Sequence, residues 1–144
     1  MQKTQKGMKL PKPKHQSKYT IPRLRRLADK AWFDSFFTDT SDYAPGDTLL
    51  VGCMACEKLA SQVHHFFYKG SYSHLRYDID NGVPLCKGCH FLLHHHDPKV
   101  IEAKIIARRG PKWLKRLEKK TNNPPKKVFK GKEYYKGIIE QFKN

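Results

Sequence analysis

The segment CMACEKLASQVHHFFYKGSYSHLRYDIDNGVPLCKGCHFLLHHH, residues 53–96, carries the pattern most indicative of a particular fold. It contains two Cys-x-x-Cys pairs, with 29 residues between them, formed by Cys53, Cys56, Cys86 and Cys89. Two such pairs can supply four thiolates in the tetrahedral arrangement that structural Zn²⁺ favours. We therefore expect one zinc ion to join the two pairs, close the ends of the segment between them and contribute strongly to stability.

Two other uses of the cysteines fit the sequence less well. Two disulfides would require an oxidising compartment, and the N-terminal sequence MQKTQKGMKLPKPK has no apolar core or cleavage site typical of a secretory signal. A redox role for one Cys-x-x-Cys pair leaves the second pair unexplained. No apolar run approaches the length of a membrane span. We expect a cytoplasmic protein that does not insert into membranes.

The residues between and after the cysteine pairs predict a hairpin followed by a helix. SQVHHFF (61–67) is typical of a strand, residues 68–82 of a polar loop, and residues 83–85 of a second short strand. A helix is expected over residues 87–96, where Asp97-Pro98 ends it.

The flanking sequence predicts helices on both sides. Apolar residues at intervals of three and four indicate a helix over residues 22–37, followed by a loop over 38–48. After Asp97 we expect two helices separated by Gly110-Pro111, a linker over 121–131 and a terminal amphipathic helix. The sequence therefore predicts four parts. They are a flexible basic arm (1–20), the first helix with its loop (21–48), a cysteine- and histidine-rich centre (49–97) and a basic helical region (98–144).

Positive charge is concentrated at the two ends of the chain. The 144 residues carry a net charge of +16, and residues 1–30 hold ten Lys and Arg against Asp29 alone. Residues 98–144 hold 15 bases and 4 acids, whereas the centre is weakly acidic. Clustered bases of this kind favour a nucleic acid as partner. One alternative is that these bases bind an anionic membrane surface. The other is that they bind no partner and form a solvated surface that keeps the protein soluble.

The central histidines occupy positions suited to metal chemistry. His64 and His65 are consecutive on the predicted strand, so their side chains should point to opposite faces. His90 and His94 are four residues apart on the predicted helix and can bind one ion. The run His94–His96 can also be ordinary solvated surface.

The order of these residues resembles the HNH endonuclease family, on VHHFF (63–67), DIDNGVPLC (78–86) and CKGCHFLLH (86–94). The resemblance implies an α+β fold with a small ββα-metal core, stapled here by the four-cysteine zinc site and flanked by helices. It implies His64 as a metal ligand, His65 as general base and Asn81 as the residue that orients the base by bonding backbone across the loop. His90 and His94 would complete the metal shell, although other members keep only one of them as a ligand.

The implied activity is hydrolysis of DNA phosphodiester bonds to 5′-phosphate and 3′-hydroxyl ends, with one divalent ion (Mg²⁺, Mn²⁺, Ni²⁺ or Zn²⁺). Such hydrolysis needs a base to activate water and a cation to offset charge on the phosphoryl and leaving oxygens. More loosely, RLRRLADKAWFDSFF (23–37) and LRYDIDN (75–81) are similar to phage recombination nucleases of the NinG type. That likeness points to recombination or branched DNA.

DNA contacts are expected from the loop after the first strand, at Lys69, Tyr72 and Arg76. Arg76 can clamp a phosphate or form a salt bridge to Asp78 or Asp80. The sequence leaves open RNA as the substrate, a homodimer that cuts two strands, and a zinc-stabilised nucleic-acid-binding protein without catalysis.

Overall fold

The fold of the computed structural model is mixed α and β, and the structure describes residues 19–38 and 50–143. The expected arm over 1–20 and loop over 38–48 lie almost wholly outside these residues. The elements in chain order are α1 (Ile21–Ser35), β1 (Gln62–His65), the 3-10 turns η1 (Ser73–Leu75) and η2 (Ile79–Asn81), β2 (Gly82–Leu85), α2 (Lys87–His95), α3 (Pro98–Arg109), α4 (Pro111–Asn122) and α5 (Lys132–Gln141).

β1 and β2 form a two-stranded antiparallel sheet in which His64 lies opposite Val83 and His65 opposite Gly82. The strand expected over 61–67 ends at His65 because Asn81 takes over the next hydrogen bonds. The Phe66 N–H donates to the Asn81 backbone oxygen at 2.9 Å, and the Phe67 N–H donates to its Oδ1 at 2.8 Å. Asn81 therefore continues the strand ladder beyond the paired residues, through its backbone and its side chain together.

Gly82 allows the first helix to approach this hairpin closely. A Cβ at Gly82 would lie 2.1 Å from Cζ of Phe36, which follows α1. Any larger residue at position 82 would force the Phe36 ring to move, because the ring occupies the space of a Cβ.

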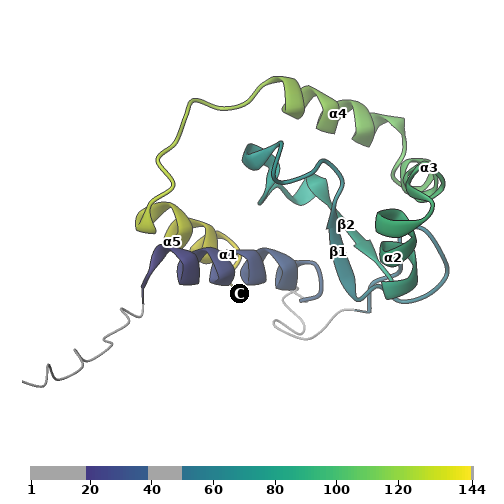
Figure 1. The fold of residues 1–144 in the computed structure, drawn as a ribbon, viewed down its shortest axis with the longest axis horizontal. Helices are drawn as coiled ribbons and strands as arrows, with labels where there is room; N and C mark the ends of the chain where they lie inside the picture. Colours follow the sequence, from purple (N-terminus) through teal and green to yellow (C-terminus); the bar gives the residue numbers. More distant parts are fainter. Residues whose placement is uncertain (1–18, 39–49, 144) are drawn as a thin grey trace, which may run out of the picture.

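Two hydrophobic cores hold the described residues together. One combines the cysteines and the hairpin with buried residues of α2, α3 and α4, among them Ile105 and Leu117. The other is formed by α1, α5 and Tyr77. Figure 1 shows α5 (yellow) beside α1 (purple to blue), so the first and last helices pack as a pair although they are far apart in sequence.

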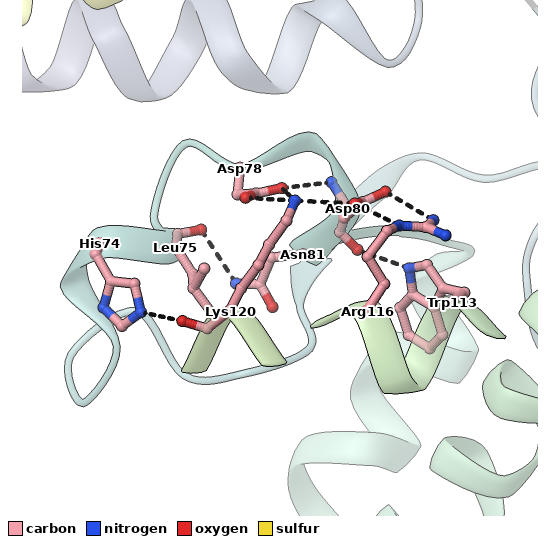
Figure 2. A network of polar contacts seen from close by, with 8 residues as sticks. All are labelled: His74, Leu75, Asp78, Asp80, Asn81, Trp113, Arg116 and Lys120. Atoms are coloured by element: carbon pink, nitrogen blue, oxygen red, sulfur yellow. Dashed lines mark hydrogen bonds and ion pairs between the residues drawn. The ribbon is translucent and has the colours of Figure 1, made fainter. Parts of the chain in front are cut away.

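A polar network ties α4 to the loop that precedes β2 (Figure 2). Lys120 Nζ lies 2.9 Å from a carboxylate oxygen of both Asp78 and Asp80, and Arg116 Nε donates to Asp80 at 3.0 Å. Trp113 Nε1 donates to the Asp80 backbone oxygen at 2.9 Å. The loop is therefore held by residues one and two helical turns apart on α4.

The helices agree with the periodicity of the sequence to within a few residues. α1 ends at Ser35 rather than 37, and α4 continues to Asn122, which shortens the linker to residues 123–131. Gly110 adopts a φ of +91° between α3 and α4, a conformation that favours glycine. None of the described helices combines the length and apolar character that crossing a bilayer requires.

Candidate functional site

The four cysteines converge on one point. Their Sγ atoms all lie within 4.8 Å of one another, and all four residues are free thiols, so the two-disulfide alternative is wrong. The Sγ atoms of Cys56 and Cys86 are 3.6 Å apart, which leaves room for a shared ion. The arrangement is that of a structural metal site.

Backbone groups around the cysteines favour thiolates. N–H groups donate to Sγ of Cys53, Cys56 and Cys86 at 3.3–3.4 Å. Burial opposes ionisation of Cys86, but the Cys89 N–H and the neighbouring thiols outweigh it and lower the pKa of Cys86 to about 7. Burial and the neighbouring thiols raise the pKa of Cys89, and the pKa of Cys56 is also raised although the Lys58 N–H opposes this, so without a metal Cys86 ionises before these two. Arg108 of α3 donates to the Cys53 backbone oxygen at 2.7 Å and so places a positive charge beside the sulfur cluster.

A second candidate metal site is formed by three histidines. One ring nitrogen from each of His64, His90 and His94 lies within 4.8 Å of the others. Nitrogens sharing one ion at the usual bond length of about 2.0–2.1 Å would be roughly 3–4 Å apart, so small side-chain shifts suffice. Nε2 of His90 and Nε2 of His94 are 3.0 Å apart, as their spacing on α2 predicts.

Burial keeps two of these imidazoles, those of His64 and His90, neutral, as metal ligation requires. Burial, followed by the neighbouring His94 and His90, lowers the pKa of His64 to about 3. Burial and His94 also lower the pKa of His90. Each of these two neutral rings therefore has a lone pair on one of its nitrogens near pH 7.

His65 points away from this triad, toward α1. Its ring stacks on Trp32 with centroids 4.4 Å apart and planes at 12°. Its Nε2 lies 2.8 Å from the Arg76 backbone oxygen, and a carbonyl can only accept, so Nε2 carries the proton and Nδ1 keeps a lone pair. Burial lowers the pKa of His65 despite the bond to Arg76, so the ring is neutral near pH 7.

Asn81 joins the two sides of the loop. It is fully buried, and its Nδ2 donates to the backbone oxygens of Phe67 at 3.0 Å and Leu75 at 3.2 Å. With the bond from the Phe67 N–H to its Oδ1, its amide is satisfied by backbone. Asn81 thus fixes the segment whose Arg76 carbonyl holds His65.

Arg76 has an ion-pair partner that its local sequence does not indicate. Its guanidinium pairs with both carboxylate oxygens of Asp29 in α1, at 2.8 and 2.7 Å, and not with Asp78 or Asp80. Burial raises the pKa of Asp29, but the ion pair with Arg76 outweighs it and leaves that pKa below its ordinary value. Asp29 and Trp32 together make α1 a support for His65, and no local sequence signal indicated this role.

All four histidines line one cavity of about 360 Å³, together with Asp29, Trp32, Phe33, Val63, Tyr68 and Lys69. Lys69 therefore shares this cavity with the histidine triad. Tyr72 packs instead between the rings of Phe67 and His74, at 5.4 and 6.4 Å. His95 and His96 remain exposed on the surface.

Comparison with known protein families, curated proteins and solved structures finds no match for this chain.

Proposed function

We propose that this protein is a metal-dependent endonuclease of the HNH type that hydrolyses DNA phosphodiester bonds to 5′-phosphate and 3′-hydroxyl ends. The observation that carries the proposal is the arrangement of four imidazoles in one cavity. Three of them, His64, His90 and His94, face one another, while His65 is held separately by the Arg76 carbonyl at Nε2, which leaves its lone pair on Nδ1. These are the two functions, cation binding and proton transfer, that the hydrolysis needs.

In this proposal His65 accepts the proton of the attacking water at Nδ1. The Arg76 carbonyl fixes the ring's tautomer, Trp32 fixes its plane, and Asn81 holds the loop that carries the carbonyl. A divalent ion on the histidine triad would offset charge on the phosphoryl and leaving 3′ oxygens. An all-imidazole set suits Zn²⁺ or Ni²⁺ better than Mg²⁺, which prefers oxygen ligands. In the cysteine cluster, Zn²⁺ would have a structural role.

The substrate is proposed from charge. Lys69 lines the cavity, and basic residues dominate both ends of the chain, which supports a polyanion held mainly through its backbone. Branched or recombining DNA is the substrate that the loose NinG-type resemblance favours. The proposed location is the cytoplasm, and cleavage of both strands would use two copies of the single site.

The test is cleavage of supercoiled plasmid with Mg²⁺, Mn²⁺, Ni²⁺ or Zn²⁺. His65→Ala should reduce the rate by at least ~100-fold, because general-base catalysis contributes ~10²–10⁴-fold. His96→Ala is the matched control, since this exposed imidazole lies outside the cavity. If wild type and His65→Ala cut equally well with every ion, the enzyme assignment is wrong.

A second candidate is a zinc-stabilised nucleic-acid-binding protein without catalysis. The cysteine cluster and the net charge of +16 favour it and require no role for the histidines. It predicts binding whose log affinity falls linearly with log salt concentration, and no cleavage with any ion.

A further inference from the structure

A second cavity of about 790 Å³ lies between η1 and the linker that joins α4 to α5. It is more than twice the volume of the histidine cavity and shares no lining residue with it. Much of its wall is apolar and is provided by Pro124, Pro125, Val128, Phe129 and Tyr134. The proposed hydrolysis makes no use of this cavity.

Phe129 is the most unusual residue of the linker. It is 89% exposed, more than any other large hydrophobic side chain among the described residues. Its ring lies over Gly131, where a Cβ would be 2.5 Å from Cε1. Phe129 belongs to neither hydrophobic core, so packing within the fold does not explain an aromatic residue here.

The surroundings of Phe129 are strongly basic. Lys126, Lys127 and Lys130 line the cavity, and no acidic residue does. In the sequence, no acidic residue occurs between Glu118 and Glu133. An aromatic face in a cationic groove matches the way in which proteins bind single strands, by stacking bases and tracking phosphates.

We propose that this cavity binds single-stranded DNA, with an unpaired base stacked on Phe129 and the lysines contacting the flanking phosphates. The phosphates of a duplex could contact the lysines, but its bases could not stack on the Phe129 ring, because they are already stacked on one another. An anionic membrane would also attract lysines and an aromatic residue. The concave shape of the site favours a strand over a flat lipid surface.

A neighbouring cavity extends this surface toward the histidines. It is lined by Ser73, Lys130 and Tyr134, which also line the Phe129 cavity, and it adds Arg25 and Arg76. The ion-pair partner of Arg76, Asp29, lines the histidine cavity. If the protein is the nuclease proposed above, the strand site would make flapped or branched DNA, which has an unpaired strand, its preferred substrate.

The experiment measures fluorescence anisotropy of labelled oligo(dT) with the full chain and no added divalent ion, so binding is read without cleavage. Stacking of a single base on an aromatic residue predicts that Phe129→Ala weakens binding about ten-fold, with Phe129→Tyr close to wild type. Phe129→Leu should behave like Phe129→Ala, because it keeps an apolar side chain but no ring. Affinity for duplex DNA of the same length should stay within about two-fold of wild type in all three.

Phe91→Ala is the matched control, because Phe91 is also an exposed phenylalanine, on α2 and outside this cavity. The proposal is overturned if Phe129→Ala binds oligo(dT) like wild type, if Phe91→Ala weakens it equally, or if duplex affinity falls in parallel. It is also overturned if Phe129→Ala weakens binding to phosphatidylserine vesicles but not to oligo(dT). Should the wild type cut no plasmid while Phe129→Ala still loses oligo(dT) binding selectively, the strand site stands and the nuclease assignment fails.

Discussion

Asp29→Asn tests whether α1 positions the proposed base. The substitution keeps the size of the side chain but removes the charge that pairs with Arg76 through contacts of 2.8 and 2.7 Å. Hydrogen bonds to charged groups contribute about 1.5–3 kcal/mol to stability. Because the side chains of Arg76 and Asp29 are 24% and 36% exposed, solvent weakens this pair, and we expect the substitution to lower the free energy of unfolding by about 1 kcal/mol. The melting temperature should fall by only about 3–4 °C.

The effect on activity should exceed the effect on stability. Once the guanidinium of Arg76 is released, the carbonyl that holds Nε2 of His65 is less well fixed. Loss of a group that orients a catalytic or ligating histidine costs about 10–100-fold, and we expect about 10-fold in the rate of plasmid cleavage. Since the Asp29 charge raises the pKa of His65, the substitution should lower that pKa further and move the acid limb of the pH–rate profile to lower pH.

Asp34→Asn provides the matched control, because Asp34 also lies on α1 and pairs with Lys30, but does not contact the loop of Arg76. The assays are plasmid cleavage across pH, thermal unfolding, and an NMR titration of the His65 ring that does not depend on activity. A positioning role for Asp29 is excluded if Asp29→Asn leaves both the His65 pKa and the cleavage rate as they are in Asp34→Asn.

Two further predictions concern stability. Cys86→Ser should abolish stoichiometric zinc binding and destabilise the fold by several kcal/mol, as seen by metal analysis and thermal unfolding; an unchanged melting temperature would contradict a structural metal. Lys120→Met removes the ion pairs with Asp78 and Asp80 and should lower the free energy of unfolding by about 1 kcal/mol at pH 7. The control Lys119→Met, at an exposed neighbouring position, should change it little. Hydrogen bonding to Arg116 and Lys120 lowers the pKa of Asp80 from 3.8 to about 2, so this stabilisation is complete above pH 3.8 and is lost as the pH falls toward 2. Urea unfolding of wild type and Lys120→Met should therefore differ at pH 7 and converge near pH 2; a constant difference would exclude the carboxylates as its source.

The packing of α1 on α5 gives the terminal helices a role at the candidate site. Trp32 is buried in the core that also contains Tyr135, and its ring forms the stack on His65. Arg25 of α1 donates to the Tyr135 hydroxyl at 3.1 Å, so α5 is joined to the same helix by a polar contact as well. The support of the proposed base therefore depends on residues from both ends of the chain.

Local spacing in the sequence determined much of this protein. The two Cys-x-x-Cys pairs predicted the sulfur cluster, because each knuckle turns its two thiols the same way. The interval between His90 and His94 predicted their proximity, since residues four apart share a helix face. The periodicity of apolar residues predicted the helices. Because successive strand residues point to opposite faces, the sequence also predicted that His64 and His65 lie on opposite sides.

How the predicted elements support one another depends on contacts between residues far apart in the sequence. Arg76 pairs with Asp29, 47 residues away, rather than with the nearby Asp78, which binds Lys120 of α4 instead. Trp32 has the periodicity of a core residue, and nothing near it in sequence indicates a stack on His65. Periodicity reports which side of a helix is buried, but the partner across a core depends on how separate elements pack, and a single sequence does not encode that locally.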